Sequence, residues 1–147
     1  MKISKSVVFL FPVLCGCSIN QQEPQNHIDD VVIETDRDYQ EVSDYELTWE
    51  AIFDVENEQY YVYFYSLTCS HCSELKNYII GKGLERGDIY FVKGTSRDRL
   101  TNDQNQLIGA ENPDDFRILG YPTLVLISHQ KCTKNLSGVA QIKAELK

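Results

Sequence analysis

The sequence is poor in basic residues. It contains 14 Lys and Arg against 22 Asp and Glu, and its formal net charge is −8. Nucleic-acid-binding surfaces need clustered Lys and Arg, so nucleic acid is excluded as the expected partner. Internal repeats and low-complexity tracts are also lacking in this chain of 147 residues, of which 42% are apolar. This length and composition predict one compact domain with a hydrophobic core.

At its N-terminus the sequence lacks an apolar run long enough to span a bilayer as a helix. The run covers only Ser6–Leu14, and Lys2 and Lys5 precede it. A positively charged start followed by a short apolar run is typical of an export signal. We therefore expect the mature chain to lie outside the cytoplasm, where thiols are not kept reduced.

The end of this signal contains two of the five cysteines. The sequence Leu14-Cys15-Gly16-Cys17 resembles the bacterial lipobox, in which a small residue precedes a cysteine that receives lipid. The resemblance implies that residues 1–16 are a lipoprotein signal peptide and that Cys17 is the lipid anchor. The protein would then be attached to the extracytoplasmic face of a bacterial cell membrane. The alternative is an ordinary cleaved signal in which both cysteines are incidental.

Residues 17–38 are mostly polar and acidic, a composition that resists packing, and we expect them to form a flexible tether. A short apolar island at Val31–Ile33 is a candidate edge strand. The globular domain is expected to cover residues 39–147.

The first half of this domain predicts a helix, a strand and a second helix. Ser43 and Glu46 fit a capping box at the start of the first helix. Tyr60–Tyr65 is apolar or aromatic at every position, as in a central strand buried on both faces. The second helix is expected to begin at Cys69 or Ser70.

Glycine and proline predict the later boundaries. Gly81 and Gly83 are expected to stop the second helix near Ile80. Asn112-Pro113 predicts the start of a short helix that runs through Leu119. The other expected elements are strands at 89–93 and 123–128, a turn at 129–131, a partner strand ending near Gly138 and a final helix at 139–147.

This order of elements predicts an α/β three-layer sandwich with a central mixed sheet flanked by helices. The alternating part favours parallel pairing through helical crossovers, and the late tight turn favours an antiparallel edge.

A cysteine pair, Thr68-Cys69-Ser70-His71-Cys72, follows the buried strand directly. This spacing suits a structural disulfide, a metal clip or a redox dithiol. A disulfide across so short a loop would stabilise little. Zinc would need four ligands, and the candidates to complete the set are His71, His129 and Cys132, of which the last two are expected at the far end of the sheet. The redox interpretation is favoured, and the other two stay open.

The position of the pair supports redox chemistry. At a helix start, the helix dipole and free amides favour the thiolate of Cys69, the form that attacks disulfides. Cys72 would lie one turn on and resolve the mixed disulfide. A partly protonated His71 would lower the pKa of Cys69 further and make the disulfide more oxidising. Ser70 is expected to add only a weak hydrogen bond, and Cys132 to be a half-buried free thiol.

A second motif, Gly120-Tyr121-Pro122-Thr123, precedes a strand about fifty residues on. A cis bond at Tyr121–Pro122 would leave the backbone groups of Tyr121 free to hold a substrate chain. Most X–Pro bonds are trans, so the motif by itself does not predict the cis form.

The stretches YVYFYSLTCSHC and GYPTLVLI, followed by Gly138, resemble thioredoxin-fold proteins over residues 39–147. The resemblance implies a dithiol–disulfide oxidoreductase with Cys69 as nucleophile, Cys72 as resolving thiol and Pro122 as a cis-proline. Tyr121 and Pro122, with Thr68 and Ser70 beside the nucleophile, are the expected substrate-binding residues.

Within this family the sequence shows mixed features. His71 is similar to its counterpart in DsbA-type oxidases, whereas the compact size resembles thioredoxin and bacteriocin transport accessory proteins. Members commonly have a buried carboxylate six residues before the first cysteine, where this chain has Tyr63. Thioredoxins usually have Trp directly before that cysteine, where this chain has Thr68.

The sequence therefore predicts a membrane-anchored, extracytoplasmic enzyme that exchanges disulfides with protein thiols. We expect a monomer that needs a membrane redox partner to reset the pair and no metal, nucleotide or organic cofactor. The alternatives are a non-catalytic thioredoxin-like accessory module for secretion and a substrate-specific disulfide reductase.

Overall fold

The computed structural model describes residues 36–94 and 97–147. The predicted signal peptide (residues 1–16), the lipid anchor Cys17 and the candidate edge strand at 31–33 lie outside the described residues. None of the helices described is long and apolar enough to cross a membrane.

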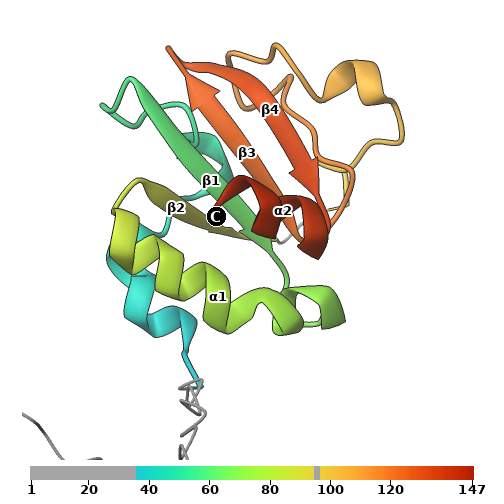
Figure 1. Ribbon diagram of the computed structural model, residues 1–147. Coiled ribbons are helices and arrows are strands. Elements are labelled where there is room, and N and C mark those ends of the chain that lie inside the picture. Colours follow the sequence, from blue (N-terminus) through green and yellow to red (C-terminus); the bar gives the residue numbers. More distant parts are fainter. Residues whose placement is uncertain (1–35, 95–96) are drawn as a thin grey trace, which may run out of the picture. The chain divides into compact units, whose positions relative to one another are not determined.

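A four-stranded mixed sheet forms the centre of the domain (Figure 1). Its order is β2-β1-β3-β4, with β1 parallel to β2, β3 antiparallel to β1, and β4 antiparallel to β3. The predicted mixed sheet of a thioredoxin-like α/β fold is thus confirmed. The strands are β1 (Gln59–Tyr65), β2 (Ile89–Lys93), β3 (Thr123–Ser128) and β4 (Lys131–Ser137).

The central strand β1 is buried on both faces, as its sequence predicted. Tyr60, Val62 and Phe64 point into one hydrophobic cluster, and Tyr63 and Tyr65 point into the other. Successive side chains of a strand alternate between faces, so the unbroken apolar sequence fills both layers of the core.

The two α-helices cover the same face of the sheet (Figure 1). Helix α1 (Ser70–Arg86) and helix α2 (Val139–Glu145) bury their apolar side chains against Tyr63 and Tyr65. The opposite face is covered by the short 3-10 helix η2 (Trp49–Ala51), the residues that follow it, and a long loop.

Two predictions that concern this loop are wrong. The helix expected from Asn112 is absent: the Asn112 side chain accepts hydrogen bonds from the amides of Asp114 and Asp115, but the chain then extends. Phe116 and Ile118 are both fully buried, an alternation that belongs to extended chain and not to a helix. No helical crossover joins β2 to β3, and β3 pairs antiparallel with β1. The parallel pairing expected for this strand is therefore also wrong.

Helix α1 is longer than predicted, because Gly81 and Gly83 do not end it. A Cβ atom on Gly83 would lie 2.8 Å from Cζ of Phe91, so this glycine lets the helix pack closely on β2. The helix ends at Gly87, whose φ of 70° is left-handed. Packing, and not helix termination, explains the glycine at position 83.

The predicted capping box of Ser43 and Glu46 does not form. A capping box is instead formed by Asp38 and Glu41, five residues earlier, at the start of the 3-10 helix η1 (Tyr39–Tyr45). Glu46 is extended and pairs with Phe91 of β2, so the expected α-helix through Leu47 does not form. A third 3-10 helix, η3 (Gln104–Gln106), lies in the loop.

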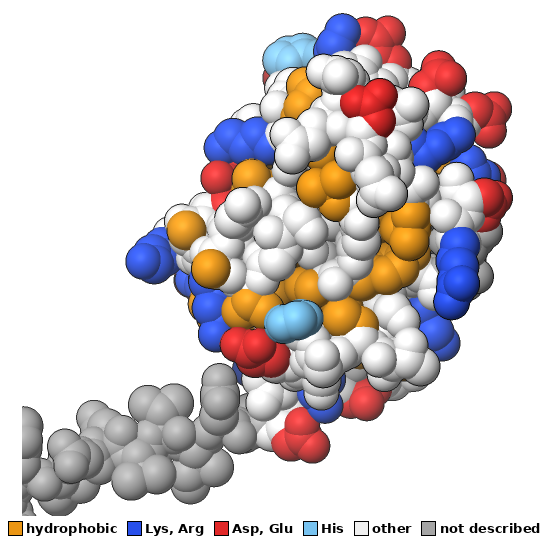
Figure 2. Space-filling model, turned by 90° about the vertical axis from the view of Figure 1, so that its right-hand side faces the viewer, with side chains coloured by type: hydrophobic (Ala, Val, Ile, Leu, Met, Phe, Trp, Pro, Cys, Tyr) orange, Lys and Arg blue, Asp and Glu red, His pale blue; other side chains and the backbone are white. Residues whose placement is uncertain are grey.

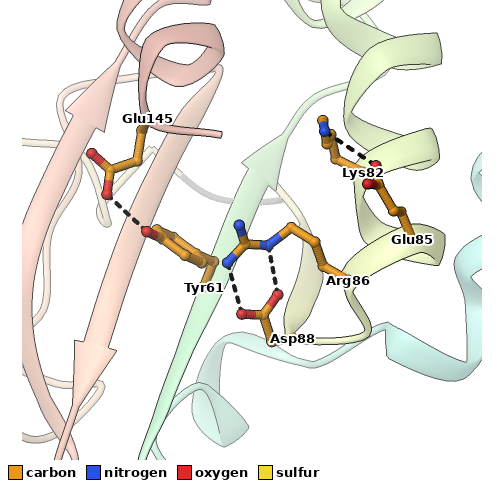
Figure 3. Close-up of polar contacts among 6 residues, drawn as sticks. All are labelled: Tyr61, Lys82, Glu85, Arg86, Asp88 and Glu145. Carbon is orange, nitrogen blue, oxygen red and sulfur yellow. Dashed lines mark hydrogen bonds and ion pairs between the residues drawn. The ribbon is translucent and has the colours of Figure 1, made fainter. Parts of the chain in front are cut away.

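Polar contacts join α1, β1 and α2 at the end of the sheet (Figure 3). The Tyr61 hydroxyl donates to Glu145 at 2.7 Å, and the Arg86 guanidinium lies 5.2 Å from the centre of the Tyr61 ring. Arg86 also donates two hydrogen bonds of 2.9 Å to Asp88, across the connection from α1 to β2.

Candidate active site

The predicted nucleophile lies at the first turn of α1. After β1 the chain turns at Ser66, whose carbonyl accepts a hydrogen bond from the amide of Cys69 at 3.2 Å. Cys69 is extended (φ −92°, ψ 120°) and is the N-cap residue of the helix. An N-cap side chain faces the free amides of the first turn, where a helix favours negative charge.

The Cys69 sulfur makes two polar contacts. It accepts a hydrogen bond from the amide of Cys72 at 3.4 Å and donates one to the carbonyl oxygen of Tyr121 at 3.3 Å. The thiol is half-buried, so part of it is open to solvent. The structure therefore brings both cysteines and Tyr121 together, as the sequence predicted.

Cys72 differs from Cys69 in its exposure. Its side chain is 1% exposed and belongs to the hydrophobic cluster between α1 and the sheet. Burial raises the pKa of the Cys72 thiol to about 12. A hydrogen bond with the Ser66 backbone acts in the opposite direction and lowers this pKa. Both cysteines are free thiols here. The arrangement gives one accessible thiol and one protected thiol, one helical turn apart.

The Tyr121–Pro122 peptide bond is cis, as the resemblance implied. Pro122 is buried, and its carbonyl accepts a hydrogen bond from the amide of Gly138, the N-cap residue of α2. The Tyr121 ring is half-buried, and a pocket of about 510 Å³ borders it. This pocket is also lined by Trp49, Lys93 and Arg99, which gives it mixed polar and aromatic walls.

Three other predicted site residues lie at the surface beside Cys69. The side chains of Thr68, Ser70 and His71 are all exposed. The Thr68 hydroxyl shares a hydrogen bond with Ser66 at 3.1 Å, whereas Ser70 and His71 form no side-chain hydrogen bond among the described residues. The predicted action of His71 on Cys69 stays a prediction.

The alternative of a metal site finds no support in the described part of the chain. No group of three or more His, Cys, Asp or Glu side chains lies close enough there to hold a metal ion. His129 and Cys132 lie at the far end of β3, where Ser128 pairs with Gln59. Cys132 is fully buried, not half-buried as predicted, and its thiol donates to the carbonyl of Leu107 at 3.2 Å.

Two residues near the site were not predicted. The aromatic ring of Tyr121 lies against Gly94, where a Cβ atom would come within 2.3 Å of it. Tyr39 stacks on Tyr65 at 3.8 Å between ring centres and reaches the cluster around Cys72. Neither belongs to a motif with fixed spacing, so the sequence held no signal for them.

Comparisons with known proteins find structural likeness only. No protein-family model matches the chain, and no curated protein sequence matches it. Among solved structures, it is similar to mitochondrial thioredoxin 3 from Saccharomyces cerevisiae, with 19% identity, a TM-score of 0.45, and coverage of 68% of this chain and 88% of that one.

A second and a third structure show the same degree of likeness. Thioredoxin f2 from Chlamydomonas reinhardtii has 19% identity, a TM-score of 0.45, and coverage of 69% of this chain and 88% of its own. Thioredoxin f from spinach chloroplast has 13% identity, a TM-score of 0.47, and coverage of 69% and 78%. The fold assignment rests on the strand order and connections of the chain itself.

The centre of the face that contains the first turn of α1 is uncharged. Figure 2 shows this face, which lies at the right in Figure 1: hydrophobic and neutral side chains occupy its middle, and Lys, Arg, Asp and Glu lie mostly around its edge. Exposed apolar residues include Leu67, directly after the strand that leads to Cys69, and Leu119, close to Tyr121 in sequence.

Proposed function

We propose that the protein is a thiol–disulfide oxidoreductase that exchanges disulfides with protein thiols through Cys69 and Cys72. One observation supports this function above the others: the half-buried Cys69 thiol is the N-cap of α1, with the amide of Cys72 at 3.4 Å and the carbonyl of Tyr121 at 3.3 Å. A structural disulfide would not require a helix terminus at one sulfur or a backbone acceptor opposite it.

The exchange would take place in two steps. The Cys69 thiolate attacks one sulfur of the partner disulfide, forms a mixed disulfide, and releases the other partner sulfur as a thiolate. The Cys72 thiolate then attacks the Cys69 sulfur and releases the second partner thiolate. The protein dithiol loses two electrons and becomes a disulfide, while the partner gains them. In the oxidative direction the same steps run in reverse.

The partner chain is proposed to lie along Tyr121 and Pro122. The Tyr121 carbonyl, which accepts from the Cys69 thiol in the free protein, would be adjacent to the partner sulfur in the mixed disulfide. The uncharged face around the site suits a partner segment without dense charge (Figure 2). Thr68 and Ser70 are exposed beside the nucleophile and are proposed to contact that segment.

We further propose the setting that the N-terminal sequence predicts: signal peptide 1–16, lipid at Cys17, and a domain on the extracytoplasmic face of a bacterial membrane with a membrane redox partner. Fatty-acid labelling of the bacterial cell would test it. Label should enter the wild-type chain and be absent from Cys17→Ala. Equal labelling of both chains would contradict the lipid anchor and leave the redox proposal intact.

Covalent trapping tests the redox function. Cys72→Ser retains the nucleophile but cannot resolve, so it should accumulate mixed disulfides with protein partners, which dithiothreitol releases. The matched control Cys69→Ser/Cys72→Ser should accumulate none. If Cys72→Ser traps no more than this control, the dithiol is not an exchange site, and a non-catalytic binding module becomes the better account.

The direction of exchange follows from the reduction potential of the pair, measured in a glutathione series. A value near the roughly −270 mV of thioredoxin would favour the disulfide reductase, and one near about −120 mV would favour the oxidase.

A further inference from the structure

The surroundings of the resolving thiol are phenolic. The titratable groups that influence the Cys72 charge, or are influenced by it, include Cys69, Tyr63, Tyr39 and Tyr121. They come from the N-cap of α1, from β1, from η1 and from the residue before Pro122, and none of them is a carboxylate. Cys72 must nevertheless lose a proton before it can attack, and it is 1% exposed.

Two of these tyrosines have a hydroxyl group in an unusual state. The hydroxyl oxygens of Tyr39 and Tyr63 are buried, and neither makes a hydrogen bond of standard distance and angle with a described residue, although Tyr63 lies near enough to Tyr39 and Cys72 to interact with both as a hydrogen-bonding group. Buried polar groups without a partner are rare and cost stability, so each calls for an explanation. The other buried tyrosines of β1 do have partners: Tyr60 donates to the Ile52 carbonyl at 2.8 Å, and Tyr65 donates to Glu46 at 2.8 Å.

The two hydroxyls and the thiol form one cluster. The Tyr63 side chain lies on the α1 side of β1, is 0% exposed, and shares its hydrophobic cluster with Cys72. Tyr63 and Tyr39 are near enough to shift each other's pKa, and the charge of Cys72 acts on both. The stack of Tyr39 on Tyr65 holds it in place behind Tyr63.

We propose that Tyr63 is a positioning residue for the resolving step: its neutral hydroxyl donates a hydrogen bond to the Cys72 sulfur when that sulfur becomes a thiolate, and the Tyr39 hydroxyl supports Tyr63 from behind. This inference rests on the proposed function, since it assigns a role in the second exchange step. It explains why two buried hydroxyls remain unpartnered beside a neutral thiol.

The step balances without a base in the protein. The Cys72 thiol loses its proton to water, and the departing partner sulfur leaves as a thiolate or takes up a proton from water according to its own pKa. The Cys72 thiolate forms a bond to the Cys69 sulfur, and the bond from Cys69 to the partner breaks with its electron pair on the partner sulfur. Tyr63 keeps its own proton throughout and supplies only the hydrogen bond.

The chemistry of Tyr63 agrees with a donor role. Burial raises the pKa of Tyr63 far above its usual range, so the side chain stays a neutral phenol and cannot act as a stored base. A neutral phenol donates well to an anion, and a hydrogen bond to a charged group is stronger than one between neutral groups. Tyr63 lowers the Cys72 pKa, whereas burial raises it, and this direction agrees with a donor that stabilises the thiolate.

The test separates the two exchange steps by their rates. The full-length chain with Cys15→Ser and Cys17→Ser is reduced and mixed with dithiobis(nitrobenzoate), which releases one coloured thiolate when Cys69 attacks and a second when Cys72 resolves. The double variant Cys69→Ser/Cys72→Ser gives the baseline of the buried Cys132. Both phases are followed from pH 6 to pH 10.

We expect Tyr63→Phe to slow the second phase by about tenfold and to displace its pH profile upward by about one unit, with the first phase unchanged. Tyr39→Phe should show a smaller effect in the same direction. The matched control is Tyr60→Phe, which removes a buried hydroxyl from the other face of β1 and should leave both phases within about twofold of wild type.

Each outcome is decisive. If the second phase of Tyr63→Phe has the rate and pH profile of Tyr60→Phe, the positioning role is wrong although the enzyme exchanges disulfides. If Tyr63→Phe does not fold, an unchanged second phase in Tyr39→Phe overturns the inference and a slower one supports it. If wild type shows a first phase but no second, the proposed function itself fails.

Discussion

Individual residues give this site its asymmetry. Cys69 is half-buried at a helix terminus, whereas Cys72, three residues later, is 1% exposed and has its pKa raised by burial to about 12. The accessible thiol can meet a partner, and the protected one meets only the sulfur beside it. Such a difference suits sequential attack and resolution, and a symmetric metal clip would not produce it.

The contact between Gly94 and Tyr121 predicts the effect of one methyl group. Gly94→Ala would place a Cβ atom 2.3 Å from the Tyr121 ring, so the ring must move, and we expect its displacement to disturb the Tyr121 carbonyl beside Cys69. We expect exchange with a protein disulfide to slow by about tenfold, because an error of about 1 Å in a reacting geometry costs that much or more. Stopped-flow rates with a reduced or oxidised protein partner would measure this.

Gly120→Ala is the matched control for that change. A Cβ atom at Gly120 would have no atom within 4 Å outside its chain neighbours, and Gly120 directly precedes Tyr121. Its rate should remain that of wild type. Equal rates for Gly94→Ala and wild type would show that the Tyr121 position does not control exchange.

At the scale of elements, helix α1 connects the site to the sheet. The helix begins at the Cys69 N-cap, buries Leu75, Ile79 and Ile80 in the core, and packs on β2 at Gly83. Arg86 in its last turn donates two hydrogen bonds to Asp88, the residue directly before β2 (Figure 3). The packing along its length determines where its first turn lies relative to Tyr121.

Two glycines in α1 should therefore respond in opposite ways to the same substitution. Gly83→Ala would bring Cβ within 2.8 Å of Phe91, and we expect the free energy of unfolding to fall by about 1–2 kcal/mol, because overpacking outweighs the gain in helix propensity. At Gly81 the nearest atom is Nε of Arg37 at 3.7 Å. Gly81→Ala should raise the free energy of unfolding by about 0.5–1 kcal/mol.

Guanidinium denaturation of both variants measures these changes. The comparison keeps the chemistry of the substitution and the helix constant and varies only the neighbour. An increase in stability for both would mean that β2 moves away freely from α1, contrary to the close contact that we describe.

At the scale of the whole molecule, burial of ionisable groups links stability to pH. Burial raises the pKa of Tyr60, Tyr61, Cys72 and Cys132 to about 12, from 10.0 for the tyrosines and 9.0 for the cysteines. The unfolded chain loses these protons at lower pH than the folded one. Their contribution to stability is therefore complete below about pH 9 and is lost as the pH rises toward 12.

We expect the free energy of unfolding to decrease with pH from about pH 9 to pH 12, with the cysteines acting first and the tyrosines above pH 10. Denaturant titrations at several pH values measure this slope. Cys132→Ala removes one buried thiol far from the site, so its slope between pH 9 and 10 should be shallower than that of wild type. An equal slope would mean that Cys132 is as ionisable in the fold as in the unfolded chain.

The strands, the turn after Ser128 and the place of the cysteine pair could all be predicted from the amino-acid sequence. These features depend on neighbours in the chain: the unbroken run Tyr60–Tyr65 indicates a strand buried on both faces, and cysteines directly after it meet the next helix start. Helix ends and loop structure were predicted less well, as the capping box at Asp38 and the extended chain at Phe116 show.

The two unpredicted neighbours of the site became visible in the three-dimensional packing alone. The contacts of Gly94 with Tyr121, and of Tyr39 with the cluster around Cys72, join residues far apart in the chain. Gly83 resembles a helix stop until Phe91 is placed against it. Burial of the Cys72 thiol likewise depends on how α1 packs on β1. The pKa of a thiol follows from the solvent it loses and the charges around it, and the spacing of residues in the sequence specifies neither.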